Sequence, residues 1–364
     1  MGIRIIMKIA FLNIYSGIVD RGAEVFVKEI SSRLKENHTV DVYSSKIDKK
    51  EAISQTPLSF LGKILYKFYL DSHSRRVLWF TLKLIPKILA SNYDWIIPVD
   101  AGWQLLILKF FQGLKKYPTP LKLRRTSKIL VSGQAGIGRD DLRNLRMNPD
   151  VFVALTERAY KWAKEINSSS KIVKIPNGVD LHKFSPAGDK ATINLEKPVV
   201  VCVAGLNPYK RVDLTIKAVA KMGEGSLLLV GDGPQREEID RLGEKFLGKG
   251  RFLRLTVNHD ELPTYYRSAD VFTLVSESSE AFGIAYLEAM ASGLPVVATD
   301  DEIRHEIVGE AGLFVDPENV EEYTRTLEKA LESDFNAKPR RQAQQFSWDK
   351  IAGEYEKTMM IMVK

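Results

Sequence analysis

The sequence predicts an α/β protein with two doubly wound domains, each a parallel sheet covered by helices on both faces. Short apolar runs occur in one series in the first half of the chain and in a second series in the second half. These runs do not alternate between apolar and polar residues, and segments with helical periodicity separate them, as is typical of parallel strands buried on both faces. A chain of 364 residues also suits two domains better than one.

The expected elements follow one another as strand, helix, strand. Strands are predicted in the first half at residues 7–13, 39–44, 94–99, 128–132, 151–156 and 171–176. In the second half they are predicted at 198–205, 226–233, 251–255, 270–276, 295–299 and 312–315. Helical patterns between them include residues 25–35, 213–222, 236–246 and 284–291. This order predicts two Rossmann-like sheets.

The domain boundaries are expected where proline and glycine gather, at residues 176–198. We expect an N-terminal Rossmann-like domain over residues 1–178 and a C-terminal Rossmann-like domain over 197–345. The tail, 346–364, is expected to form a last helix that packs back toward the N-terminal domain. Because ligands of open parallel sheets bind at the carboxyl ends of the strands, the natural site is a central cleft that the two domains face.

Composition indicates a cytoplasmic protein. The only cysteine, Cys202, allows no internal disulfide, which suits a reducing compartment. The apolar start contains Arg4 and Lys8 and no small-residue cleavage site, so it is interpreted as a first strand and not as a signal peptide, with Met7 as an alternative start. No uncharged apolar run approaches the roughly 18 residues of a membrane span.

Positive charge is concentrated in residues 58–128. This segment holds thirteen Lys or Arg and three acidic residues, a surplus of ten, whereas the whole chain has a net charge of +7. Aromatic and aliphatic residues alternate with these cations, which favours an amphipathic surface that binds anionic lipid or a lipid-linked acceptor on the inner face of the membrane. An ordinary helical insertion with solvated lysines explains the pattern equally well. Nucleic acid is a weaker interpretation, since the segment has no recognised nucleic-acid motif.

The stretch SESSEAFGIAYLEAMASGLPVVAT carries two glutamates, Glu280 and Glu288, in apolar surroundings. It is expected to be a loop after a strand, followed by a helix that begins near Gly283. The free amides at Gly283 and Ile284 would bind a phosphate, and the two carboxylates would accept hydrogen bonds from hydroxyl groups beside it. The pattern therefore indicates a sugar nucleotide. The alternative is that Glu280 is a first-turn acid and Glu288 a solvated helix residue.

Three further loops of the second half follow predicted strands. In AGLNPYKRVD, Lys210 and Arg211 stand where cations would neutralise a diphosphate, although a solvated basic turn is as plausible from this motif alone. Gly231 lies in the tight VGDGP loop. The backbone around Val257 would bond a base edge, and the neighbouring His259 is predicted to be a helix-start residue and not a ligand.

Two loops of the first half are also candidates. Gly22 lies in SGIVDRGAEVF, which opens onto a helix, but the segment lacks the dinucleotide fingerprint. Gln134 is the polar residue nearest the strand end in SGQAGIGRDD. The five histidines are scattered without metal-ligand spacing, isolated acid pairs are usually solvated turns, and no Ser/His/Asp arrangement is apparent.

Taken together, these motifs resemble those of a known family. They are PNGVD with a later phenylalanine (residues 176–184), GLNPYKRVD, GDGP, EAFGIAYLE followed by AMASGLPVVAT, and FSWD before the last helix. With them the chain resembles the retaining glycosyltransferases of family 4, which have the GT-B fold. The resemblance covers most of the chain and is strongest from about residue 151 to 350.

The resemblance implies a role for each matching residue. Glu280 would touch the donor sugar, Glu288 would bind the ribose, and Lys210 would face the diphosphate. The amides at Phe282 to Ile284 would hold the phosphates, and the RGAE loop resembles the Gly-Gly-x-Glu loop of the family. The family implies a nucleotide-sugar donor, a glycan or lipid-linked glycan acceptor, no separate cofactor and no metal requirement.

Two positions depart from the family pattern. The family usually has an arginine five residues before the lysine, where this chain has Gly205, and Arg211 does not occupy the matching position. It often has a histidine where this chain has Gln134. A catalytically silent module that binds a nucleotide sugar or acts as a scaffold, and a sugar-nucleotide epimerase, are therefore the alternatives to a transferase.

Overall fold

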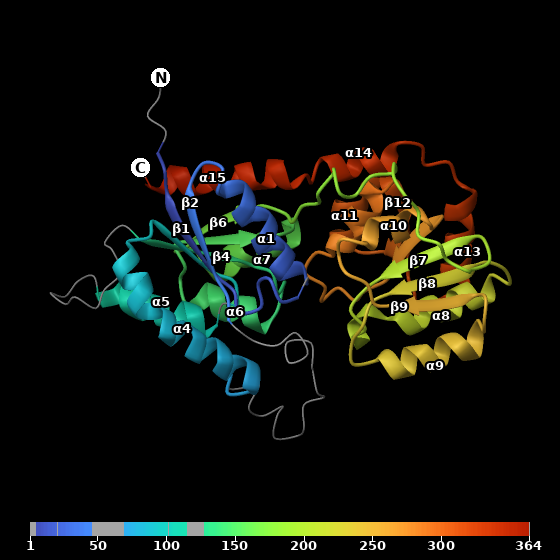
Figure 1. Cartoon of the computed structure of the whole chain (residues 1–364), viewed down its shortest axis with the longest axis horizontal. Coiled ribbons are helices and arrows are strands. Elements are labelled where there is room, and N and C mark those ends of the chain that lie inside the picture. Colours follow the sequence, from blue (N-terminus) through green and yellow to red (C-terminus); the bar gives the residue numbers. More distant parts are fainter. Residues whose placement is uncertain (1–4, 20, 46–68, 101, 115–126, 364) are drawn as a thin grey trace. The chain divides into compact units, whose positions relative to one another are not determined.

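The structure is a computed structural model that describes residues 5–19, 21–45, 69–100, 102–114 and 127–363 (Figure 1). The chain divides into two compact units. The N-terminal unit comprises Met1–Pro176 and Asp349–Lys364, and the C-terminal unit comprises Asn177–Trp348. Each unit is built on a six-stranded sheet whose strands pair in parallel, so the predicted α/β class with two doubly wound sheets is confirmed.

The sheet of the N-terminal unit has the order β2-β1-β3-β4-β5-β6. Its strands are β1 (Lys8–Leu12), β2 (Thr39–Tyr43), β3 (Trp95–Pro98), β4 (Lys128–Ser132), β5 (Val151–Ala154) and β6 (Lys171–Lys174). The helices are α1 (Gly22–Leu34), α4 (Ser72–Ser91), α5 (Trp103–Gly113), α6 (Arg139–Arg146), α7 (Glu157–Ile166) and α15 (Trp348–Val363). The strand order reverses between β1 and β3, so this sheet has its switch point there.

The sheet of the C-terminal unit has the order β12-β11-β10-β7-β8-β9, with its switch point between β7 and β10. Its strands are β7 (Val199–Val203), β8 (Ser226–Val230), β9 (Phe252–Leu255), β10 (Val271–Leu274), β11 (Val296–Thr299) and β12 (Gly312–Val315). The helices are η2 (Pro208–Lys210), α8 (Val212–Lys221), α9 (Arg236–Phe246), α10 (Leu262–Arg267), α11 (Ile284–Ala291), α12 (Glu302–Val308), η3 (Gly309–Ala311), α13 (Val320–Glu332) and α14 (Lys338–Gln344).

Each predicted strand is present, and most are shorter than predicted because the chain turns into a loop where the sheet ends. The run predicted at 226–233 stops at Val230, since Gly231 has a φ of +153°. A Cβ atom at Gly231 would lie 1.9 Å from the carbonyl oxygen of Ala204, so the next loop packs directly on the backbone after β7. The helices predicted at 236–246 and 284–291 are confirmed at both ends.

Helix α4 is shaped by its two ends and by one apolar face. Asp71 caps its start by accepting a hydrogen bond from the Ser74 amide at 3.1 Å, and Asn92 ends it in the left-handed conformation. Its buried face packs with α5 into the core of the N-terminal unit through Ile85, Ile88, Leu105 and Leu108. The opposite face of α4 is exposed.

No helix of the described ranges is long and apolar enough to cross a membrane.

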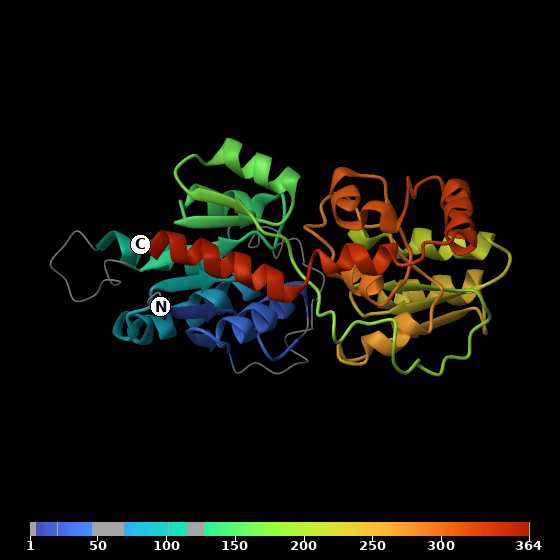
Figure 2. The same cartoon turned by 90° about the horizontal axis from the view of Figure 1, so that it is seen from above.

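The last helix, α15, belongs to the N-terminal unit (Figure 2). The ring of Tyr355 lies 5.5 Å from that of Phe26 on α1, and its hydroxyl is 3.0 Å from Ser132 Oγ at the end of β4. Nearer the end of the helix, Glu356 contacts His38 Nε2 at 3.0 Å. These contacts bury one face of α15 against both α1 and the sheet.

Candidate functional site

The switch point of the C-terminal sheet brings two charged side chains together. Lys210 ends the short helix η2 after β7, and Glu280 lies in the loop after β10. The Lys210 ammonium donates a hydrogen bond to the Glu280 carboxylate, and both side chains are nearly buried. The Glu277 amide also donates to the Tyr209 carbonyl at 2.8 Å. The two loops singled out by the sequence therefore form one structure at the edge where ligands of such sheets bind.

Two guanidinium groups fix the loop that carries Glu280. Arg211 donates to the carbonyl of Val275 at 2.7 Å and to that of Ser276 at 3.1 Å. Arg304, fully buried, donates to the carbonyls of Ser276 and Glu277 at 3.1 and 2.8 Å. Arg211 thus supports the loop backbone. Arg304 was not anticipated, because a lone arginine in a helical segment gives no signal of such a role.

The start of α11 presents backbone amides, as the sequence predicts. Gly283 precedes the helix with φ +88°, and a Cβ atom there would lie 2.6 Å from the Tyr286 ring. The first amides of a helix have no earlier helical carbonyl to bond, so those near Ile284 are suited to an anion. The Phe282 side chain is buried, with its ring 6.2 Å from that of Phe346, and so only the backbone of Phe282 is available to a ligand.

Glu288 is the centre of a buried network. Its Oε2 accepts a hydrogen bond from the Tyr266 hydroxyl at 3.0 Å, and its Oε1 lies 2.7 Å from His259 Nε2. Lys183 Nζ lies 2.7 Å from His259 Nδ1 and 2.6 Å from Asp260 Oδ1. Because an ammonium only donates, Nδ1 accepts and Nε2 donates to Glu288. Burial and the neighbouring Glu288 raise the pKa of Tyr266 well above its usual value.

This network corrects two expectations. His259 is not a helix-start residue, since α10 begins at Leu262, and its ring instead orients the Glu288 carboxylate. Glu288 is 5% exposed and is not a solvated helix residue. Local sequence patterns miss the network because Lys183 and Glu288 lie far from His259 along the chain and meet only in the folded sheet.

The other candidates of the C-terminal unit line neighbouring loops. A Cβ atom at Gly205 would come no closer than 3.4 Å to another atom, the side-chain nitrogen of Asn207, so this position has room for a side chain. Gly231 has no such room. Val257 is half-buried just after β9. Beside it, the Thr256 hydroxyl donates to the Gly231 carbonyl at 3.4 Å, which joins the loops after β8 and β9.

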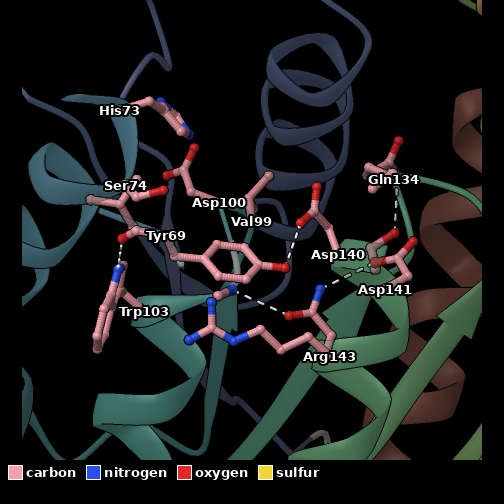
Figure 3. A pocket seen from close by; sticks show the side chains of 15 residues that line it. Tyr69, His73, Ser74, Val99, Asp100, Trp103, Gln134, Asp140, Asp141 and Arg143 are labelled. Atoms are coloured by element: carbon pink, nitrogen blue, oxygen red, sulfur yellow. Dashed lines mark hydrogen bonds between the residues drawn. The ribbon is translucent and has the colours of Figure 1, made fainter. Parts of the chain in front are cut away.

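Two candidates lie in the N-terminal unit. Gly22 is the first residue of α1, and two residues later Glu24 is buried, with Oε1 bonded to Asn13 at 3.3 Å. Burial raises the pKa of Glu24. Gln134 donates to Ser132 Oγ at 2.9 Å and lines a cavity of about 160 Å³ (Figure 3). Within the described ranges, no three His, Cys, Asp or Glu side chains are grouped to hold a metal ion.

Comparison with known sequences identifies the family. Residues 21–183 match the sequence model described as "Glycosyltransferase Family 4", and residues 187–346 match "Glycosyl transferases group 1". The chain belongs to glycosyltransferase family 4. The two matches of this family-4 chain adjoin and include each candidate residue of both units.

One relative of this family-4 chain is the GDP-mannose-dependent alpha-(1-6)-phosphatidylinositol monomannoside mannosyltransferase of Mycolicibacterium smegmatis. The two are 32% identical over 255 residues, which cover 62% of this chain and 65% of the relative. The chain therefore matches somewhat less than two thirds of the length of that relative.

Solved structures show the same fold over nearly the whole chain. The sucrose-phosphate synthase of Thermosynechococcus elongatus gives a TM-score of 0.76 at 18% identity, covering 98% of this chain and 99% of that one. HepE of Anabaena, solved in complex with UDP and glucose, gives 0.72 at 18% identity, with 97% and 99% covered. The family-4 chain thus has the GT-B fold with two Rossmann-like domains, as the motifs predict.

Proposed function

We propose that this protein is a glycosyltransferase that moves a sugar from a nucleotide-diphosphate donor to an acceptor hydroxyl, with retention of the anomeric configuration. The observation that carries the proposal is the meeting of Lys210 and Glu280 at the switch point of the C-terminal sheet, beside the start of α11. A cation, an anion and a row of helix amides suit the diphosphate and the sugar hydroxyls of such a donor.

In the proposed reaction, the leaving phosphate of the donor acts as the base that takes the proton of the acceptor hydroxyl. The acceptor oxygen bonds to the anomeric carbon on the face from which the diphosphate departs, the bond from that carbon to the phosphate oxygen breaks, and the acceptor proton passes to this oxygen. Lys210 and the amides near Ile284 stabilise the charge that develops on the leaving group. Glu280 orients the sugar and Glu288 the ribose. No metal ion and no separate cofactor take part in this scheme.

The names of two similar proteins favour uridine or guanosine as the nucleoside of the donor. HepE was solved with UDP, and the mycobacterial relative is named for GDP-mannose. We therefore expect UDP or GDP to raise the melting temperature of this protein in the presence of EDTA. At 100 times its dissociation constant a nucleotide stabilises by about 2.7 kcal/mol, a shift of several degrees at most.

The test of this function has two stages. A thermal-shift panel of UDP, GDP, ADP, dTDP and CDP, with and without EDTA, identifies the base, and Glu288→Ala serves as the binding-deficient variant. NMR of the product formed with the matching sugar nucleotide then gives the anomeric configuration. An inverted product would rule out the retaining scheme, and stabilisation by no nucleotide would favour a silent module.

We further propose that helices α4 and α5 bind an anionic membrane surface on the cytoplasmic side. Trp79 and Phe110 are 62% and 63% exposed, with Leu82 and Leu106 also exposed. Arg75, Lys83 and Lys87 are exposed on α4, and neither helix contains an acidic residue. Aromatic side chains beside lysines and arginines are typical of interfacial helices. Part of the basic segment, residues 58–68, 101 and 115–126, lies outside the described residues.

The membrane proposal fits a lipid-linked acceptor, since the mycobacterial relative is named for a phosphatidylinositol mannoside. Its test is cosedimentation with phosphatidylcholine vesicles that contain phosphatidylglycerol, at low and high salt. We expect Trp79→Ala with Lys83→Gln to weaken binding, and Phe246→Ala, at an exposed position in the C-terminal unit, to leave it unchanged. Absence of binding by the wild type at low salt would reject the proposal.

A further inference from the structure

A cavity of about 160 Å³ lies within the N-terminal unit, near the switch point of its sheet (Figure 3). Asp100, just after β3, and Gln134, just after β4, line it from the sheet edge. Asp141 and Arg143 line it from α6, and Tyr69 lies across it from the chain before α4. A cavity of about 150 Å³ holds a benzene-sized molecule, so this one has room for a single six-membered ring.

Arg143 supplies the guanidinium group of this cavity. Its guanidinium carbon lies 3.8 Å from the centre of the Tyr69 ring and 5.5 Å from that of Trp103. Its Nη1 is buried and has no hydrogen-bond partner among the described residues, and no carboxylate of those residues forms an ion pair with it. A desolvated guanidinium nitrogen without a partner is costly, so a bound oxyanion would stabilise this arrangement.

Asp140, a third carboxylate that lines the cavity, is already engaged. Asp140 Oδ1 accepts a hydrogen bond from the Tyr69 hydroxyl at 2.8 Å and lies 3.7 Å from Arg139 Nη2. Trp103 Nε1 donates to the Tyr69 carbonyl at 2.8 Å, which holds the two rings in place around Arg143. The guanidinium is therefore positioned by packing and not by an anion of the described residues.

The other two carboxyl groups of the cavity are poor anions at neutral pH. Burial raises the pKa of both Asp100 and Asp141 to about 7. Asp100 Oδ2 accepts hydrogen bonds from the Ile14 amide at 2.8 Å and Gln104 Nε2 at 3.1 Å, and Asp141 Oδ1 accepts one from Asn144 at 3.1 Å. Partly protonated carboxyls repel an anion weakly, and they both donate to and accept from hydroxyl groups.

We propose that this cavity selects an acceptor whose terminal ring carries hydroxyl groups and an oxyanion, a phosphate or a carboxylate, with Arg143 binding the oxyanion. The inference rests on the proposed function, because it names the acceptor class of that reaction. Asp100 and Asp141 bind the ring hydroxyls. The planar guanidinium matches two oxyanion oxygens, which gives the site its preference for charged rings.

The experiment is calorimetric titration of the protein with glucose 6-phosphate, glucuronate and glucose in phosphate-free buffer. We expect both charged rings to bind, and glucose to bind at least about 10-fold more weakly, as for loss of a charge-assisted hydrogen bond. Arg143→Gln is expected to lose the affinity for the charged rings by a similar factor. Arg146→Gln, exposed on the same helix and outside the cavity, is the matched control.

Folding and donor binding are checked separately. Arg143→Lys keeps the positive charge but not the planar guanidinium with its two parallel donors. We expect this variant to bind the charged rings with intermediate affinity. Nucleotide stabilisation, which tests the C-terminal unit, should be equal in wild type and variants, so failure of the transferase proposal and failure of this inference are distinguishable. Equal binding of glucose and glucuronate, unchanged binding by Arg143→Gln, or no binding of either charged ring by the wild type would overturn the inference.

Binding to lipid vesicles distinguishes two sources of the charged ring, a lipid headgroup and a free phosphorylated sugar. Phosphatidylinositol has a polyhydroxyl ring on its phosphate and phosphatidylglycerol has the same charge without a ring. If vesicles with phosphatidylinositol bind more tightly, and Arg143→Gln removes the difference, the acceptor is a lipid headgroup. If the two vesicles bind alike while free glucose 6-phosphate binds through Arg143, the acceptor is a free phosphorylated sugar.

Discussion

The polar sites of the two units differ in how completely their charges are paired. In the C-terminal unit, Lys210 is bonded to Glu280, and both oxygens of Glu288 have partners. In the N-terminal unit, Arg143 Nη1 has no partner among the described residues, and the pKa of Asp100 is raised by burial. The first site is assembled before a ligand arrives. The second has a buried guanidinium nitrogen that no residue of the described ranges pairs with, and a ligand could bind it.

The comparison predicts that transfer activity is sensitive to the loss of any one charged side chain of the site in the C-terminal unit. The largest effect is expected for Glu280→Gln, because the change removes the charge that we propose contacts the donor sugar and that pairs with the nearly buried Lys210. Transfer should fall by about 10²- to 10³-fold, as for loss of one preorganised electrostatic group. Initial rates with saturating sugar nucleotide measure it.

The control for this variant is Glu277→Gln, three residues earlier in the same loop. The Glu277 side chain is exposed, and its backbone carbonyl, which Arg304 holds, is unchanged by the substitution. It should retain wild-type activity. If Glu280→Gln is as active as Glu277→Gln, the pair at the switch point has no catalytic role. If the wild type itself transfers no sugar, the protein is a binding module.

A smaller loss is expected when Glu288, which we propose binds the ribose, or its neighbour His259 is changed. Glu288→Gln should weaken nucleotide binding by about 10- to 100-fold, because a charged acceptor of hydroxyl hydrogen bonds becomes neutral. His259→Ala should weaken it less, since His259 contacts Glu288 and is a positioning residue. Calorimetry separates binding from changes in melting temperature. A greater loss in His259→Ala than in Glu288→Gln would contradict this order.

Gly205 allows a gain of function to be tested. Because a Cβ atom there meets nothing closer than 3.4 Å, Gly205→Arg should fold and add the cation that the family usually has. We expect nucleotide binding about 10-fold tighter, as for one charge-assisted hydrogen bond.

Gly231 is the contrasting glycine, because a Cβ atom there would lie 1.9 Å from a carbonyl oxygen. Gly231→Ala should lose about 2 kcal/mol or more of stability in urea unfolding.

The two units also differ in how much of each site the sequence predicts. Lys210, Glu280 and Gly283 lie in the segments that follow β7 and β10, so parallel topology alone predicts that they gather at one edge. The partners His259 and Lys183 were not predicted, because side-chain contacts between distant loops leave no periodic pattern. Nor was Arg143 predicted, because its importance comes from the packing that leaves Nη1 without a hydrogen-bond partner among the described residues.

The last effect expected from the comparison is on the pH dependence of stability. Burial raises the pKa of Asp141 from 3.8 to about 7, so the folded state binds a proton that the unfolded state has released. This contribution to stability is fully present below pH 3.8 and is lost as the pH rises through about 7. The slope approaches about 1.4 kcal/mol per pH unit at most.

Asp141→Asn isolates this contribution, because the amide keeps the shape of the side chain and does not titrate. The difference in unfolding free energy between wild type and variant, measured in urea from pH 4 to 8, should therefore move in favour of the variant as the pH rises. Asp189→Asn, at an exposed carboxylate of the C-terminal unit, should show no such trend. A bound oxyanion at Arg143 favours protonated neighbours, so glucuronate should raise the folded-state pKa of Asp141 further and steepen the wild-type slope near neutral pH. If glucuronate leaves that slope unchanged, Asp141 is buried for packing alone and does not sense the ligand.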